Sequence, residues 1–159
     1  MTFGYKDNFH FRSIRIEDEK KVRNIIFPIL KSYGLALDLN GVDSDLMNIT
    51  EHYRQGLFGV VELEGSKELI GSFALYPMGN GVVELRKMYL LEEYRGKGIG
   101  KWIITFCENY AKEQSYKKVI LETASVLKGA IILYRKLGYM ESKEALHTER
   151  CDIILEKVL

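Results

Sequence analysis

The stretch Arg95-Gly96-Lys97-Gly98-Ile99-Gly100 has the residue types of an anion-binding loop. Its three alternate glycines lie between an apolar strand-like run and an amphipathic helix-like run, so main-chain N–H groups are left without partners at a helix start. These groups and the positive end of the helix dipole stabilise phosphate oxygens. Arg95, Lys97 and Lys101 add positive charge. The stretch predicts a phosphate site, with a solvated surface turn as the alternative.

The spacing excludes two common phosphate-binding patterns. A nucleoside-triphosphate loop needs glycine at the position of Arg95, and Ser or Thr at the position of Trp102. A dinucleotide fingerprint needs its third glycine at the position of Lys101. The pattern that remains is Arg-x-x-Gly-x-Gly.

Composition limits the size and the partners of the protein. The 159 residues are 47% hydrophobic, enough for one packed core and too few for two ordinary domains, so one domain over residues 1–159 is expected. With 23 Lys and Arg against 22 Asp and Glu, the chain offers no general field for nucleic acid or a membrane surface. No apolar run approaches the ~20 residues of a membrane span. We expect a cytoplasmic protein, monomeric or homodimeric, without nucleic-acid or membrane partners.

Cysteine and histidine usage predicts no metal site. Cys107 and Cys151 are isolated within apolar patterns, and both are predicted to be buried thiols. His10, His52 and His147 are scattered, without the spacing of metal ligands.

Hydrophobic periodicity places the glycine loop between a strand and a helix. The segment 82–123 has the order strand, loop, helix, strand, and such a crossover implies parallel strands with a ligand at their carboxyl ends. Hairpin turns are expected at Glu64-Gly65-Ser66-Lys67 and at Gly79-Asn80-Gly81. The expected strands are 9–17, 58–63, 69–76, 82–91, 118–123, one that begins at Tyr139, and 151–158. The expected helices are 22–33, one that runs to Tyr53, 99–111 and 130–137. The first is expected to be kinked or divided by Pro28 and ended by Gly34, and the second to be capped by Asp43 or Ser44.

Four motifs follow one another between Val82 and Met140. They are Glu-Leu-x-x-Met-Tyr, Tyr-Arg-Gly-x-Gly-Ile-Gly, Leu-Glu-Thr and Ala-x-x-Leu-Tyr-x-x-x-Gly-Tyr. This part of the chain resembles the core of the GCN5-related N-acetyltransferase (GNAT) family, and the amino-terminal half agrees in element order. The resemblance implies an α/β fold: a mixed central sheet of six to seven strands with a splayed parallel pair, flanked by about four helices.

The resemblance also implies acetyl-CoA as co-substrate. The main chain of Met88, Tyr89 and Leu90 would bind the pantetheine amides where the strands splay, and an N–H near Tyr89 or Leu90 would stabilise the oxyanion. An ordinary core strand is compatible with that role. The pyrophosphate would lie on the loop residues Arg95, Gly96, Lys97, Gly98, Ile99, Gly100 and Lys101. Two departures are Leu127, where the family often has an Asn that contacts pantetheine, and Leu91-Glu92-Glu93 in place of Val-x-Pro.

Two side chains match the family's catalytic positions. Tyr134 would contact CoA and protonate the departing thiolate, although its place on an apolar helix stripe also fits simple packing. Glu84 would take the proton of the amine, which is mostly protonated at neutral pH because its pKa is ~10. Arg86 shares the face of Glu84, so a structural salt bridge is the competing interpretation. Glu122 and bulk water are the alternative bases.

The function implied is an acetyl-CoA-dependent N-acetyltransferase that needs no metal. It would transfer acetyl directly to a primary amine of a small or amino-acid-like molecule. The alternatives are a protein lysine or amino-terminal acetyltransferase and a non-catalytic acyl-CoA-binding sensor.

Overall fold

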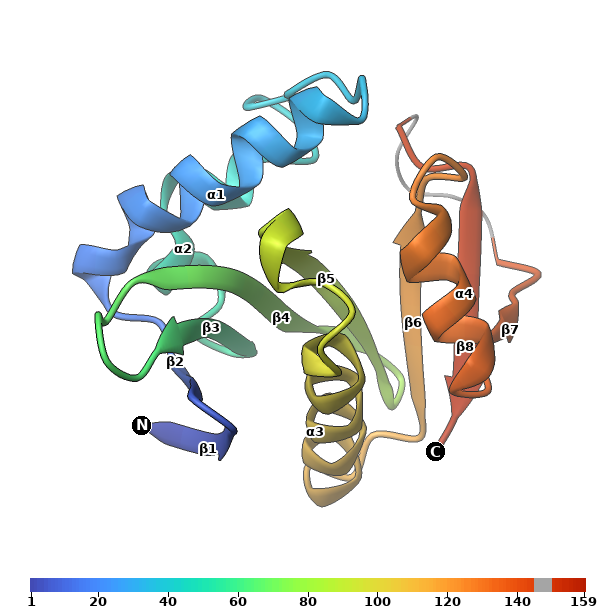
Figure 1. The fold of residues 1–159 in the computed structure, drawn as a ribbon. Helices are drawn as coiled ribbons and strands as arrows, with labels where there is room; N and C mark the ends of the chain where they lie inside the picture. Colours follow the sequence, from blue (N-terminus) through green and yellow to red (C-terminus); the bar gives the residue numbers. More distant parts are fainter. Residues whose placement is uncertain (145–149) are drawn as a thin grey trace.

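The fold is built on a mixed β-sheet, and the computed structural model describes residues 1–144 and 150–159 (Figure 1). Across the described residues the strand order is β1-β2-β3-β4-β5-β6-β8-β7. Among the strands of residues 1–144 and 150–159, β5 and β6 are the one parallel pair of neighbours, and the other pairs are antiparallel. The strands are β1 Thr2–Lys6, β2 Phe9–Ser13, β3 Leu57–Leu63, β4 Leu69–Gly79, β5 Val82–Leu90, β6 Lys118–Thr123, β7 Met140–Glu141 and β8 Ile153–Val158.

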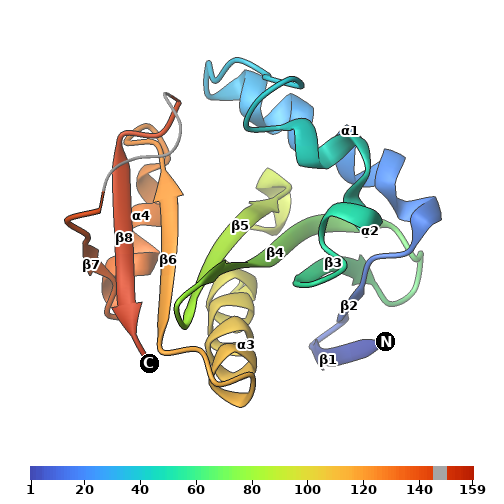
Figure 2. The ribbon, with the colours of Figure 1, turned by 180° about the vertical axis from the view of Figure 1, so that it is seen from behind.

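Helices cover both faces of this sheet (Figures 1 and 2). One face carries α1 Glu19–Ser32 and α2 Ile49–His52, which pack on β3 and β4 around Ile26 and Val60. The other carries α3 Ile99–Glu113 and α4 Lys128–Lys136, which pack around Phe73. The α-helices in the described part of the chain are all too short or too polar to span a membrane.

The expected α/β fold with four helices is confirmed, and in the described part of the chain the sheet has eight strands where six to seven were expected. The unforeseen strand is β1, which forms a hairpin with β2. Asp7 and Asn8 connect the two strands, and Asp7 has a φ of +52°. Asp and Asn adopt positive φ more readily than most residues, but the pair lacks the glycine of the strong hairpin signals, and β1 itself carries only a weak apolar pattern.

The strand expected over 9–17 is too long, since β2 ends at Ser13. The carboxylate of Asp18 accepts the Arg15 N–H at 2.9 Å and an Arg12 guanidinium N–H at 2.7 Å. These bonds turn the chain into a 3₁₀ helix, Ile16–Asp18, that leads into α1.

The structure corrects two expectations about the first helices. Helix α1 runs unbroken from Glu19 to Ser32, so of the two effects expected of Pro28, a kink or a division, the division does not occur. The helix expected to reach Tyr53 is instead a 3₁₀ turn, Ser44–Met47, followed by the single-turn α2. Asp43 makes no side-chain cap there, because its carboxylate is bonded to residues from distant segments.

The remaining elements lie within a few residues of their expected positions, and β6 has the expected bounds. Cys107 is buried as predicted, and burial raises the pKa of its thiol. Cys151 is only half-buried and precedes β8, which begins at Ile153. His147 lies outside the described residues.

A buried ionic cluster ties β2 to β3 and to the start of α1. The Arg12 guanidinium, 4% exposed, lies 2.7 Å from both Asp18 and Glu62. Burial alone would raise the pKa of both carboxyls, but hydrogen bonds and charge from Arg12 hold each pKa below its ordinary value. Both carboxylates therefore depend on Arg12.

Replacing Arg12 with Met should lower the free energy of unfolding at pH 7 by about 3–5 kcal/mol, because two buried carboxylates lose their cation. In the wild type, lowered carboxyl pKa values give stability that is complete above pH ~5 and lost as the pH falls through the folded-state values. The deficit of Arg12→Met should thus shrink in acid. Urea unfolding between pH 3 and 7 measures it.

The control is Arg54→Met, which removes an exposed pair with Glu51 and should change stability by no more than about 0.5 kcal/mol. A deficit of Arg12→Met that is independent of pH would contradict the ionic assignment.

Candidate active site

The parallel strands β5 and β6 pair only at their beginning. Val82–Glu84 lies in register with Lys118–Ile120, and pairing ends there. Beyond this point β5 stays with β4 as far as Leu90, while β6 stays with β8 as far as Thr123. The expected splay is therefore present, and the edge of β5 beyond Glu84 faces it.

A β-bulge in β5 lies within the splayed part. Arg86 pairs with Ala74, whereas the next pair is Tyr89 with Ser72, so β5 has one residue more than β4 here. Lys87 has a φ of +51°, and its carbonyl accepts the Ser72 hydroxyl at 2.8 Å. A bulge redirects side chains, and here Arg86 and Lys87 both line the same pocket.

The register after the bulge decides which main-chain groups face the splay. The Leu91 N–H donates to Ile70 on β4 at 2.9 Å. Because main-chain groups alternate in direction along a strand, those of Met88 and Leu90 face the splay, and those of Tyr89 face β4. Of the three residues predicted to bind pantetheine by their main chain, Met88 and Leu90 are oriented for it.

The glycine loop lies between β5 and the start of α3. Gly98, with a φ of +79°, precedes the first residue of α3, and a side chain there would also press against Lys6 at 3.1 Å. Gly100 has another role: a Cβ atom would come within 2.8 Å of Leu133 on α4, so glycine lets the two helices approach. Ile99 is buried, so only its main chain can bind a ligand.

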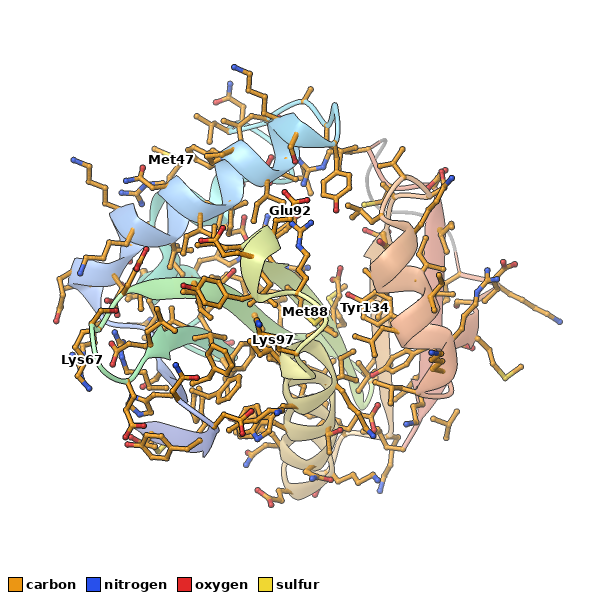
Figure 3. The ribbon with its side chains drawn as sticks, viewed as in Figure 1. Met47, Lys67, Met88, Glu92, Lys97 and Tyr134 are labelled. Carbon is orange, nitrogen blue, oxygen red and sulfur yellow. The ribbon has the colours of Figure 1, made fainter. Side chains whose placement is uncertain are left out.

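Figure 3 labels Lys97 just before α3, where it is exposed, as is Lys101. Lys6 on β1 brings a further cation near Gly98, which the sequence did not indicate.

Arg95 is bonded within the protein rather than extended into solvent. Its Nε donates to the Leu90 carbonyl at 3.0 Å, and Nη1 donates to the Tyr33 hydroxyl at 2.9 Å. The Leu90 carbonyl is one of the main-chain groups oriented toward the splay. A ligand that bonds this oxygen must share it with Arg95 or displace the guanidinium.

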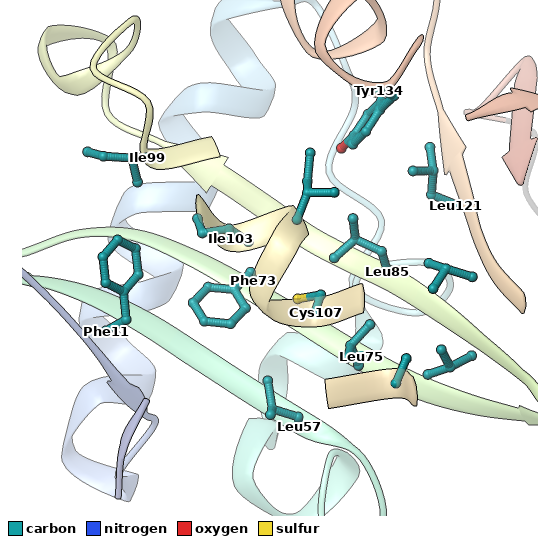
Figure 4. Packing of buried hydrophobic residues seen from close by; sticks show 14 of the residues in the cluster. Phe11, Leu57, Phe73, Leu75, Leu85, Ile99, Ile103, Cys107, Leu121 and Tyr134 are labelled. Carbon is teal, nitrogen blue, oxygen red and sulfur yellow. The ribbon is translucent and has the colours of Figure 1, made fainter. Parts of the chain in front are cut away.

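Tyr134 lies on α4 and is 6% exposed. Figure 4 shows its ring directed away from α4 toward β5, and the ring also makes an edge contact with Tyr139 at 5.9 Å. Burial raises the pKa of its hydroxyl, and nearby Tyr89 and Cys107 act in the same direction. The hydroxyl thus keeps its proton at neutral pH, and the side chain both packs and presents a donor.

A pocket of about 240 Å³ lies on the other side of β5, where β5 and β6 separate. Both candidate bases, Glu84 and Glu122, line it, whereas Tyr134 is not among its described lining residues. The alternative interpretation of Glu84 is also present: Arg86 bonds its Oε2 atom at 2.8 and 2.9 Å, and the guanidinium stacks on Tyr76 at 4.2 Å. Both Arg86 contacts fall on one carboxylate oxygen.

An ionic network surrounds this pocket, and sequence reasoning missed it. Asp43, fully buried, bonds Arg150 at 2.6 and 3.1 Å and Lys87 at 3.1 Å. Lys87 also lies 3.1 Å from Asp45, whose other oxygen accepts the Tyr53 hydroxyl. These residues are far apart in the sequence, so no local pattern could reveal their contact.

Tyr89 and His52 also line this pocket. Burial raises the pKa of the Tyr89 hydroxyl to about 12, with the charge of Arg150 opposing the shift and that of Asp43 adding to it. His52 lines the pocket and stacks on Tyr76 at 5.1 Å, and His10 contacts Thr2 and Glu62 elsewhere. Within 1–144 and 150–159, no cluster of His, Cys, Asp and Glu is arranged to hold a metal ion. A second cavity, of about 230 Å³ between β3 and the amino terminus, contains none of the predicted site residues.

Comparison with known proteins agrees with this geometry. The family model described as the acetyltransferase (GNAT) family matches residues 28–139. The uncharacterized N-acetyltransferase YjgM of Escherichia coli (strain K12) is 33% identical over 135 residues, which cover 80% of each chain.

Two solved structures share the fold at 20% sequence identity. A GNAT-family acetyltransferase from Staphylococcus aureus Mu50 has a TM-score of 0.87, over 94% of this chain and 98% of that one. PaiA N-acetyltransferase from Thermoplasma acidophilum, in complex with coenzyme A, has a TM-score of 0.75, over 96% and 100%. With a family model over most of its length, a relative at 33% identity and the splayed sheet, the chain belongs to the GNAT family of acetyltransferases.

Proposed function

We propose that this protein transfers acetyl from acetyl-CoA directly to a primary amine of a small or amino-acid-like molecule. The observation that carries the proposal is the pocket at the separation of β5 and β6, which both Glu84 and Glu122 line beside the edge of β5 that β6 leaves. Donor and acceptor sites are then contiguous. Holding both reactants together supplies much of the rate without a covalent enzyme intermediate.

The donor site is supported by main-chain groups of β5 that β6 does not pair. The main chain of Met88 and Leu90 faces the splay, where Arg95 bonds the Leu90 carbonyl, and main-chain groups in such a position require partners. The loop at Gly98 offers main-chain N–H groups at the start of α3, a helix of 15 residues, with Lys97 and Lys101 exposed beside it. This set fits an amide-bearing chain that ends in a pyrophosphate. The apolar Leu127 cannot supply the side-chain hydrogen bond of an Asn.

The chemistry assigns one role to each candidate residue. Glu84 takes a proton from the ammonium so that the amine nitrogen can attack the thioester carbon. Main-chain N–H groups at Met88 or Leu90 stabilise the oxyanion. As the carbon–sulfur bond breaks, the Tyr134 hydroxyl donates its proton to the sulfur, and burial keeps that proton in place beforehand. The attacking nitrogen loses its second proton to solvent as the amide forms, and solvent returns a proton to Tyr134.

The size of the pocket supports a small acceptor. Its 240 Å³ lies below the ~300–1,000 Å³ of pockets for drug-sized ligands. A protein acceptor would need an open groove, and a non-catalytic sensor would not need a carboxylate pair beside the splay. The small acceptor is therefore preferred to both alternatives.

A panel of free amino acids, simple alkylamines and lysine peptides should contain a small amine that releases CoA thiol from acetyl-CoA. Tight acetyl-CoA binding with no turnover across the panel would favour the sensor.

In Gly98→Glu, a carboxylate enters the proposed phosphate site, and calorimetry should find CoA binding abolished. Gly65→Glu, in an open hairpin turn, is the control and should bind CoA normally.

Tyr134→Phe should reduce kcat by about 10-fold to 1000-fold, because it removes a positioned proton donor but keeps the ring. CoA affinity and thermal stability should barely change. The matched control is Tyr139→Phe, which removes a hydroxyl from the ring packed against Tyr134 and should leave kcat near the wild-type value. Equal turnover in Tyr134→Phe and wild type would make Tyr134 a packing residue.

Glu84→Gln should lower the rate near neutral pH and remove or displace the acid limb of the pH–rate profile, since the amide cannot accept the proton. Acetyl-CoA affinity should be unchanged, and Glu122→Gln should be much milder. If only Glu122→Gln changes the profile, the two roles are exchanged. If both variants keep the wild-type profile, the amine loses its proton to solvent.

A further inference from the structure

The acceptor pocket has two walls that come from opposite sides of the splay. One wall is the connection between α1 and α2, represented by Gly41, Val42, Ser44 and Asp45. The other contains Glu122 on β6 together with Arg150 and Cys151, which precede β8. Figures 1 and 2 show that these segments approach each other at the same end of the sheet.

One ion pair joins the two walls. The Arg150 guanidinium donates to both oxygens of Asp43, at 2.6 and 3.1 Å, and also to the Ala36 carbonyl at 3.2 Å. All three contacts run from one wall to the other. The separation of the walls is therefore set by the length of a paired guanidinium and carboxylate.

The pair is built into the fold rather than resting on its surface. Asp43 is fully buried, and the Arg150 side chain is 14% exposed. Asp43 also accepts the Asp38 N–H at 3.0 Å and the Lys87 ammonium at 3.1 Å, so its carboxylate anchors the connection to the β5 bulge. Burial would raise the pKa of Asp43, but these bonds and charges hold it below its ordinary value. Separating Asp43 from Arg150 leaves the buried Asp43 carboxylate with one cation, Lys87, in place of two, which is unfavourable.

We infer that the Asp43–Arg150 pair sets the size limit of the acceptor, closing the pocket to polypeptide amines and leaving it open to small ones. The inference rests on the proposed function, because it concerns the acceptor of that reaction. A lysine within a peptide brings chain on both sides of its residue, and this chain would have to pass between walls that the pair holds together. Asp43 and Arg150 are thus specificity-determining residues that need not touch the reacting atoms.

The test compares the same amine in two sizes. The probes are lysine with both ends blocked as acetyl and methylamide, and a heptapeptide with that lysine at its centre and blocked termini. A second pair is alanine methylamide and a heptapeptide that begins with alanine. In Arg150→Gln, Asp43 keeps Lys87 as a partner, so the protein should fold, and the ratio of kcat/KM for peptide over small amine should rise by at least about 10-fold.

Controls separate selectivity from general damage. Arg150→Lys keeps the charge and should restore much of the wild-type ratio, and Arg135→Gln removes an exposed pair with Glu141 and should leave it unchanged. Asp43→Asn should raise the ratio, whereas Asp18→Asn, another buried partner of an arginine, should not. A ratio that stays at the wild-type value in both Arg150→Gln and Asp43→Asn overturns the inference, as does equal use of peptide and small amine by the wild type.

A measurement without an acceptor keeps the inference distinct from the proposed function. In Arg150→Gln with CoA bound, amide hydrogen exchange over residues 36–48 should become faster, and exchange in α3 should be unchanged. Unchanged exchange over 36–48 would show that the pair does not hold the wall, whatever the enzyme acetylates. Absence of turnover with every amine, together with faster exchange, would reject the proposed function and retain the link between the walls.

Discussion

The site depends on the point at which β5 and β6 stop pairing. Up to Glu84 and Ile120 the two strands satisfy each other's main-chain groups. Beyond it, β5 keeps β4 and β6 keeps β8, so each strand retains one partner and loses the other. Polar groups in this interior position are costly to leave unpaired. A ligand that resembles a strand can pair with them, which is why an acyl carrier with amide groups suits this fold.

The bulge at Lys87 lies in the splayed part of β5 and directs side chains toward the proposed acceptor pocket. It places Arg86 and Lys87 toward one face, while Met88 packs toward α3 and α4 on the other. The positive φ of Lys87 is unfavourable for a residue with a side chain. Its carbonyl is held by Ser72, and its ammonium by Asp43 and Asp45, so the surrounding bonds stabilise this conformation. Lys87 therefore takes part both in the bulge of β5 and in the ion pairs beside the pocket.

Sequence reasoning succeeded where an element follows from a local pattern. The glycine loop between a strand and a helix and the crossover from β5 to β6 agree with the expectation, and Glu84 and Tyr134 lie on the expected strand and helix. The roles of these residues stay predictions. Sequence reasoning failed where contacts join distant segments. Asp43 looks like a helix cap in sequence, but its partners Lys87 and Arg150 lie 44 and 107 residues away. The glycine spacing also could not distinguish the roles of two glycines. Gly98 has a positive φ that shapes the loop, whereas Gly100 leaves room for the Leu133 side chain of α4.

The bonds of Arg95 affect what an affinity for CoA would mean. Its guanidinium holds the Leu90 carbonyl and the Tyr33 hydroxyl at the end of α1, so the free protein partly satisfies its own binding edge. A ligand that binds there exchanges one set of hydrogen bonds for another. Its affinity therefore reflects the difference in free energy between the bonds made with the ligand and the bonds made with Arg95. The same guanidinium also bonds the Tyr33 hydroxyl, so a ligand that displaces it would change the bonding at the end of α1 as well. For the Leu90 carbonyl, Arg95 is therefore a competitor of any strand-like ligand.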